Sequence, residues 1–163
     1  MAENTKEQLL RYLNDSYAAE VGGMAALKDL AALATDSDLK QAVTDHIAET
    51  QSQADRVKAR VLALGGDVSE PKGALNTVLA KASSALNIGH SHEDKQTQDT
   101  IKAYSVEHFE VGAYTSLQAF ANAIGDAETA LLAQTIIGEE QMAAERLLRV
   151  IPRIAVAALQ NAA

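Results

Sequence analysis

Apolar residues recur every three or four positions along most of the chain, the spacing that places them on one face of an α-helix. Four stretches show this pattern, and none shows the two-residue alternation of a β-strand. The pattern predicts helices from Thr5 to Ala34, from Leu39 to Leu64, from Asp94 to Gly125 and from Asp126 to Pro152. We therefore expect an all-α fold.

Turn and capping residues stand at the ends of these stretches. The Thr-Asp-Ser-Asp run at 35–38 favours a helix N-cap, and the glycines at 65–66 are typical of a helix C-terminus. Ser91 with Asp94 resembles a capping box. Pro152 is expected to end or kink the fourth helix before its apolar tail.

The lengths of the connections predict the topology. Tight turns join the first helix to the second and the third to the fourth, so each pair forms an antiparallel hairpin. Residues 67–93 form a long crossover, in which apolar positions from Leu75 to Leu86 suggest a short extra helix. The chain thus predicts a four-helix bundle with one long crossover, as a single domain over residues 1–163.

Charge and composition exclude several classes of protein. The chain has 14 basic and 22 acidic residues and a net charge of −8, which disfavours binding to nucleic acid. It has no cysteine, hence no disulfide or thiolate site. No apolar run approaches the ~20 residues that span a bilayer, and the N-terminus lacks the apolar core of a signal peptide. We expect a cytoplasmic protein without a membrane partner.

The two hairpins resemble one another. Residues 18–50 align without gaps with residues 108–140, and eight positions are identical, including Glu-Val-Gly and the aspartate at the turn. Glu20 precedes the first turn as Glu110 precedes the second, and Glu49 follows the first as Glu139 follows the second. At ~1.5 Å per residue all four lie ~21 to 23 Å from their turns, in one layer of the bundle.

A helical wheel separates these acids by direction. Glu20 and Glu110 lie within the apolar arcs of their helices. Glu139 and Glu140 lie at opposite margins of the apolar arc of the fourth helix. The repeat favours Glu139 as the ligand, whereas the wheel slightly favours Glu140. Glu49 lies well off the centre of the second arc.

Carboxylates that face one another in a core need protons, ion-pair partners or cations. No lysine or arginine is expected on an inward face at this level, because Arg56 and Arg60 lie two to three turns away. A set rich in carboxylates with one or two imidazoles suits two divalent iron or manganese ions. In the alternative, these acids are flank residues whose charged ends reach water.

Two further side chains are candidates at this layer. Glu107 lies three residues before Glu110, nearer the edge of the arc, and His46 lies three residues before Glu49. His46 is a candidate ligand or a hydrogen-bonded core residue. The expected metal ligands are therefore bridging Glu49 and Glu110, terminal Glu20 with Glu139 or Glu140, and supplementary His46 and Glu107. Tyr17 and Tyr114 lie one turn from glutamates of the layer, where they are expected to hydrogen-bond to ligands, to intercept oxidising equivalents or simply to pack.

Four blocks of sequence carry a family resemblance. They are Leu13-Asn-Asp-Ser-Tyr-Ala-Ala-Glu20, His46-x-x-Glu49-Thr50-x-x-Gln53-x-x-Arg56, Val106-Glu-His-Phe-Glu110-x-x-x-Tyr114 and Gly138-Glu-Glu140. Together they resemble the ferritin-like family of the bacterial YciE and YciF stress proteins. The resemblance implies a ferritin-like bundle, a homodimer, a di-metal site and a stress-linked role. The Glu-x-x-His pairs of ferritins and rubrerythrins are missing, since Ser52 and Met142 stand in place of the histidines.

Two functional hypotheses follow. In the first, the chain is a dinuclear iron or manganese carboxylate protein that reacts with dioxygen or peroxide. In the second, it is a metal-free helical bundle that acts as a stress-related binding or scaffold module. The apolar tail from Ile151 to Leu159 is the candidate dimer contact. The residues do not identify a catalytic group, and they give no basis for a many-subunit storage shell.

Overall fold

The described part of the chain is a bundle of four long helices. The structure, a computed structural model, describes residues 3–68 and 94–161. The helices are α1 (Glu3–Leu33), α2 (Ser37–Ala63), α4 (Lys95–Ala123) and α5 (Ala127–Asn161), and the described residues include no strand. The predicted all-α bundle is confirmed. The predicted short crossover helix and Ser91 of the predicted capping box lie outside the described residues.

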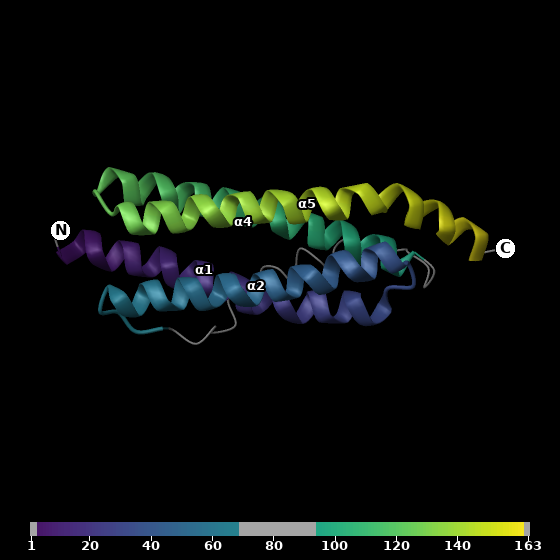
Figure 1. Cartoon of the computed structure of the whole chain (residues 1–163), viewed down its shortest axis with the longest axis horizontal. Coiled ribbons are helices and arrows are strands. Elements are labelled where there is room, and N and C mark those ends of the chain that lie inside the picture. Colours follow the sequence, from purple (N-terminus) through teal and green to yellow (C-terminus); the bar gives the residue numbers. More distant parts are fainter. Residues whose placement is uncertain (1–2, 69–93, 162–163) are drawn as a thin grey trace.

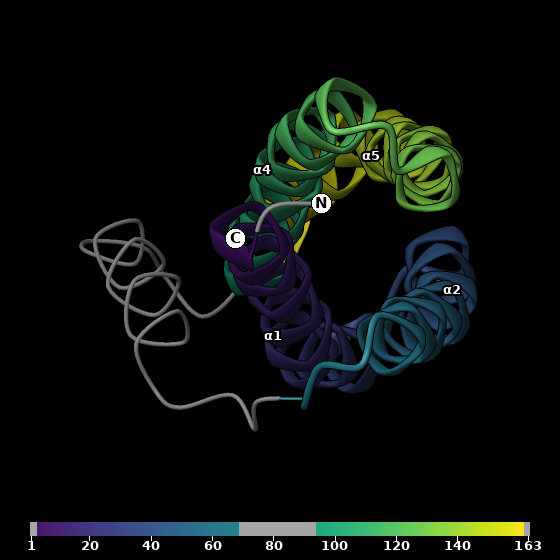
Figure 2. The same ribbon diagram turned by 90° about the vertical axis from the view of Figure 1, so that its left-hand side faces the viewer.

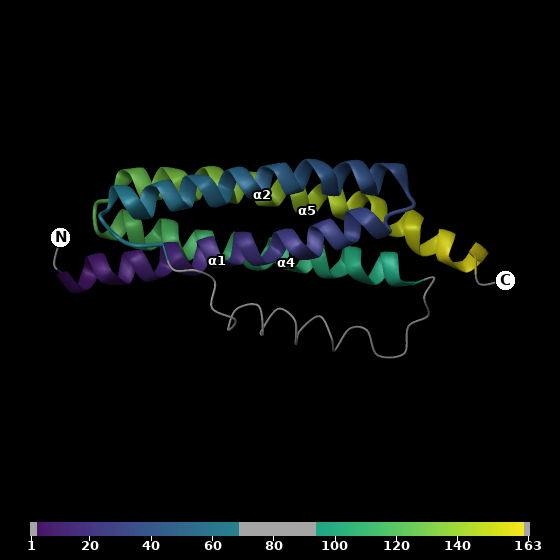
Figure 3. The ribbon, with the colours of Figure 1, turned by 90° about the horizontal axis from the view of Figure 1, so that it is seen from below.

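The helices form two antiparallel hairpins that lie against each other (Figure 1). The end view shows α1 between α2 and α4, and α5 between α4 and α2 (Figure 2). Seen from below, α2 and α5 lie side by side along the bundle, as do α1 and α4 (Figure 3). No described helix is long and apolar enough to cross a membrane.

Both hairpin turns use the predicted aspartates. Asp36 caps α2 by accepting hydrogen bonds of 3.0 Å from the backbone nitrogens of Asp38 and Leu39. Asp126 accepts a bond of 3.0 Å from the backbone nitrogen of Thr129 at the start of α5. Just before Asp126, Gly125 adopts φ +78°, a left-handed conformation that glycine takes without steric cost.

Pro152 does not end α5. The helix continues to Asn161, and its last part bends across the end of the bundle (Figure 1). The proline ring removes one backbone hydrogen bond, but Ile154 and Ala158 beyond it are buried against the bundle, which holds the segment helical. The tail predicted as a dimer contact therefore buries part of its apolar surface within its own chain.

Two apolar clusters fill the core, one on either side of a polar layer. The first joins Leu9, Leu13, Val57, Val61, Tyr114, Leu117, Ala133 and Ile136. The second joins Leu27, Leu30, Ala34, Leu39, Val43, Leu147, Val150 and Ile154. Along α1, α2 and α5 the polar layer falls between these clusters. Water is thus excluded from both ends of the layer.

Candidate metal centre

Acidic and polar side chains from all four helices meet in the layer between the apolar clusters. Each of them is at most 4% exposed: Glu20 of α1, His46 and Gln53 of α2, Glu107 and Glu110 of α4, and Glu140 of α5. Four carboxyl groups and one imidazole are therefore buried together. Glu107, expected near the edge of its helix face, is 1% exposed.

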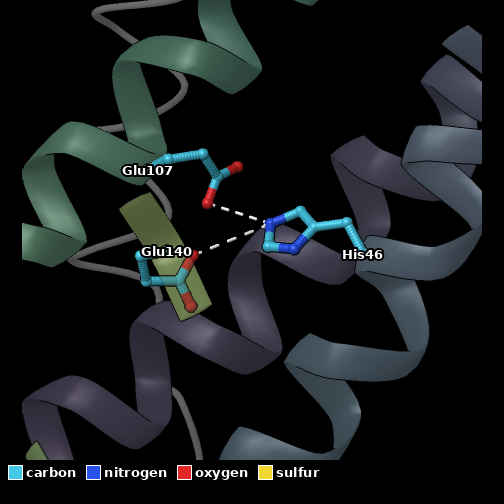
Figure 4. Close-up of side chains that lie close together, drawn as sticks. All are labelled: His46, Glu107 and Glu140. Atoms are coloured by element: carbon cyan, nitrogen blue, oxygen red, sulfur yellow. Dashed lines mark ion pairs between the residues drawn. The ribbon is translucent and has the colours of Figure 1, made fainter. Parts of the chain in front are cut away.

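The ligand atoms of this layer form two groups of three. His46, Glu107 and Glu140 form one group, and Glu20, Glu110 and Glu140 form the other. Within each group the ligand atoms lie within 4.8 Å of one another, and Glu140 belongs to both. In the first group, His46 Nε2 lies 2.9 Å from Glu107 Oε2 and 3.8 Å from Glu140 Oε2 (Figure 4). The arrangement offers two adjoining cation positions with Glu140 between them.

Electrostatics oppose ionisation of the layer when it holds no cation. Burial raises the pKa of Glu20 to about 7, and burial together with Glu107 and Glu110 raises the pKa of Glu140 to about 11. The pKa of Glu110 is likewise raised, by burial and by Glu20. Burial disfavours the imidazolium of His46, but Glu107 and Glu49 outweigh it and raise the pKa of His46. Without metal ions these groups are therefore held partly in their protonated forms, and bound metal cations would take the place of the protons.

Unpartnered buried oxygens test whether the residues fit divalent ions. Glu20 Oε2, Gln53 Oε1 and both carboxyl oxygens of Glu140 have no hydrogen-bond partner in the described part of the chain. Buried oxygens without partners are unfavourable, and bound cations satisfy them at once. The donor set of carboxylates, one imidazole and one amide oxygen, without thiolate, suits iron(II) or manganese(II). The layer therefore fits a pair of divalent ions.

Glu49 and Glu139 lie outside both groups. Arg146 of α5 pairs with Glu49, and Arg56 of α2 pairs with Glu139 at 2.5 Å. The expectation that no arginine lies on an inward face at this level fits Arg56 and Arg146, whose side chains are each 32% exposed, although their guanidinium groups reach the acids beside the layer. The structure thus buries Glu140 in the layer and leaves Glu139 partly exposed at its side.

On α2 and α5 the residues that face the core lie one position after those that the repeat suggested: Thr50 and Glu140 are buried in place of Glu49 and Glu139. Ser52 and Met142, expected at the positions of ferritin histidines, are exposed, whereas Gln53 and Ala143 are buried. Thr50, also buried, is the repeat equivalent of Glu140. Ferritin-like sites draw a Glu-x-x-His pair from each of two helices. Here α2 carries Thr-x-x-Gln and α5 carries Glu-x-x-Ala, so both histidines are absent. His46 and Glu107 are the additional donors.

Tyr114 fixes the orientation of one of the acids. Its hydroxyl donates a 2.5 Å hydrogen bond to Glu20 Oε1, and the ring is 1% exposed. The other oxygen, Glu20 Oε2, is buried and has no hydrogen-bond partner in the part of the chain that the structure describes. Tyr114 thus hydrogen-bonds to a glutamate of the layer and also packs in the first apolar cluster, which are two of the roles predicted for it. Tyr17 packs, partly buried, against the first apolar cluster.

Replacing Tyr114 by phenylalanine is expected to destabilise the metal-free protein by about 1–3 kcal/mol, because Glu20 Oε1 then stays buried without a donor. Urea unfolding of chelator-treated protein measures the effect. Tyr104→Phe, ten residues earlier on α4, is the matched control and is expected to change stability by less than about 0.5 kcal/mol. Equal losses in the two variants would mean that the Tyr114 hydroxyl contributes nothing through Glu20.

Comparison with known proteins agrees with this architecture. A protein structure from Xanthomonas campestris pv. campestris superposes with a TM-score of 0.81 and 26% identity, over 97% of each chain. The structure of the E. coli stress protein YciF gives a TM-score of 0.80 at 23% identity, over 95% of this chain and 98% of that one. A ferritin-like, diiron-carboxylate protein from Bacillus anthracis gives 0.73 at 18% identity, over 93% and 99%. The last two structures, at 23% and 18% identity, show that the fold is shared.

Similarity in sequence extends over most of the chain. Protein YciF of E. coli strain K12 is 25% identical over 138 residues, which are 83% of each protein. The family described as "Domain of unknown function (DUF892)" matches residues 4–160. These matches confirm the predicted resemblance to the YciE and YciF ferritin-like proteins. The chain belongs to the DUF892 family.

Proposed function

We propose that this chain is a dinuclear carboxylate protein that holds two iron or manganese ions in the buried layer. One ion is held by Glu20, Glu110 and Glu140, and the other by His46, Glu107 and Glu140. The single observation that carries the proposal is the sharing of Glu140 by both groups of ligand atoms, since neither of its buried carboxyl oxygens has a hydrogen-bond partner among the described residues.

Charge supports the same stoichiometry. The four buried glutamates carry −4 when ionised, which equals in magnitude the charge of two divalent ions, and a neutral His46 adds nothing. Glu49 and Glu139 are balanced by arginines and add no net charge. When its four glutamates are ionised, two divalent ions make the layer neutral and so avoid the large cost of unpaired charge in a core.

The chemistry that two such ions supply when bound is electron exchange with dioxygen or peroxide. The protein's own part is positioning and exclusion of water. Tyr114 holds Glu20 through its hydroxyl, and the two apolar clusters close the layer along the bundle axis. The groups with raised pKa values, His46 and the carboxyl groups of Glu20, Glu110 and Glu140, would release protons when cations bind, so metal uptake is expected to acidify the solution.

Metal analysis tests the proposal. Protein purified without chelator is expected to contain about two transition-metal ions per chain and to consume peroxide or dioxygen when loaded with iron(II). Less than one equivalent of any transition metal, together with an unchanged melting temperature after adding iron(II) or manganese(II), would contradict the proposal. The metal-free binding or scaffold module would then be the better description.

We further propose a stress-linked homodimer that acts in the cytoplasm. Support comes from likeness over nearly the whole chain to the E. coli protein that is described as a stress protein. Sedimentation is expected to give twice the chain mass of 17.2 kDa. Immunoblots of fractionated host cells are expected to find the chain in the cytoplasmic fraction, at higher level after oxidative stress. A monomer mass would contradict the proposed dimer, and an unchanged protein level after oxidative stress would contradict the stress-linked role.

A further inference from the structure

Two ion pairs related by the internal repeat cross from α2 to α5 beside the metal layer. Glu49 and Glu139 are separated by 90 residues, and so are their partners Arg146 and Arg56. In each pair the arginine of one hairpin holds the glutamate of the other. The internal repeat therefore includes the two arginines that neutralise these glutamates as well as the glutamates themselves.

The two pairs have similar surroundings. The side chains of Arg56 and Glu139 are 32% and 27% exposed, and those of Arg146 and Glu49 are 32% and 33% exposed. Such partly shielded pairs are held more firmly than pairs on the outer surface, where solvent competes. By contrast, Arg149 and Glu145 on α5 form a pair that is 75% and 66% exposed.

Each glutamate of these pairs also touches a buried residue of the layer. Glu49 Oε2 lies 3.4 Å from His46 Nδ1. Glu139 Oε2 accepts a 3.1 Å hydrogen bond from Gln53 Nε2, while Gln53 Oε1 is buried and has no hydrogen-bond partner within residues 3–68 and 94–161. Glu49 thus contacts the proposed ligand His46 directly, and Gln53 connects Glu139 to the layer. Released from their arginines, both acids would add negative charge to the centre.

We propose that Arg56 and Arg146 determine the charge selectivity of the metal centre. By neutralising Glu139 and Glu49 they keep these acids from the cations, so that four carboxylates remain for two divalent ions. With the arginine charges removed, up to six carboxylates face the same space, a set that balances two trivalent ions. This inference rests on the proposed function, because it assumes that the layer binds cations.

The test compares a divalent with a trivalent probe. Dissociation constants for manganese(II) and terbium(III) are measured on the wild type and on the R56Q/R146Q double variant. Each added negative charge contributes about 1.5 times as much electrostatic binding energy to a trivalent ion as to a divalent ion. The affinity for terbium(III) relative to manganese(II) is therefore expected to rise about tenfold or more. The single variants R56Q and R146Q are expected to shift it by similar, smaller factors.

Matched variants separate this role from a structural one. R149Q removes an arginine from the exposed pair on α5 and is expected to leave the ratio unchanged. E49Q/E139Q removes the paired acids and is expected to change manganese(II) affinity by no more than about fivefold. Circular dichroism reports whether each variant keeps its helix content, and the single variants serve if the double variant does not fold.

The outcomes are distinct. A folded R56Q/R146Q variant, or folded single variants, with the wild-type ratio would overturn the inference alone. So would a loss of manganese from E49Q/E139Q as large as that caused by removing Glu140, because these acids would then be ligands in the wild type. A wild-type protein that binds neither ion would overturn the proposed function, and the inference with it.

Discussion

Replacing Glu140 by alanine is expected to empty both metal positions, reducing bound manganese(II) from about two ions per chain to nearly none. Glu140 is shared by both groups of ligand atoms, and its two carboxyl oxygens have no hydrogen-bond partner in the described part of the chain. Removing it takes one carboxylate from each position and one of the four negative charges. Equilibrium dialysis with elemental analysis measures the loss.

Two comparisons sharpen this result. Glu145→Ala removes an exposed carboxylate of the same helix and is expected to leave about two ions bound. His46→Ala takes a ligand from one group only and is expected to weaken one position more than the other. A Glu140→Ala protein that still bound two ions with wild-type affinity would rule out Glu140 as the shared ligand.

The melting temperature of the metal-free protein is expected to fall as the pH rises from about 5.5 to 8.5. The pKa of Glu20 is about 7 in the folded chain, against about 4.3 in an unfolded one. A group whose pKa is raised by folding contributes stability that is complete below the unfolded pKa and is lost as the pH rises through the folded pKa. The raised pKa values of Glu110 and Glu140 act in the same direction.

Manganese(II) is expected to reverse this loss. At about a thousandfold excess over its dissociation constant, a bound ion adds about 4 kcal/mol, or roughly 10 °C for a domain of this size. The gain is expected to be larger at pH 8.5 than at pH 5.5, where protons compete for the same oxygens. Thermal scans of chelator-treated and manganese-loaded protein measure both effects.

Glu20→Gln provides the control for this pH dependence. The variant lacks one of the groups that ionise in the core, so the slope of its melting temperature against pH is expected to be smaller. A flat or rising melting temperature in metal-free wild type across this range would contradict the account of the buried layer.

Much of the fold could be predicted from the sequence because its signals are local. Aspartates at the hairpin turns cap the helices that follow, and the spacing of apolar residues gives the four helices. The end of α5 could not be predicted in this way. Pro152 disfavours a helix locally, but burial of Ile154 against residues distant in sequence outweighs it.

The direction of the acids was harder to predict than their level in the bundle. One residue along a helix turns a side chain by about 100°, so a choice between Glu139 and Glu140 depends on a small rotation. The repeat pointed to Glu139 because Glu49 and Glu139 do share a role, but that role is an ion pair with an arginine. Only the packed helices reveal that Arg56 and Arg146 reach these acids.

The most direct test of the central claim is anomalous X-ray diffraction from crystals of the manganese-loaded protein. The account predicts two anomalous peaks in the core of each chain, one on either side of the Glu140 carboxylate, with His46 and Glu107 at one and Glu20 and Glu110 at the other. Peaks that lie at Glu49 or Glu139 instead, or a core without any peak, would contradict it.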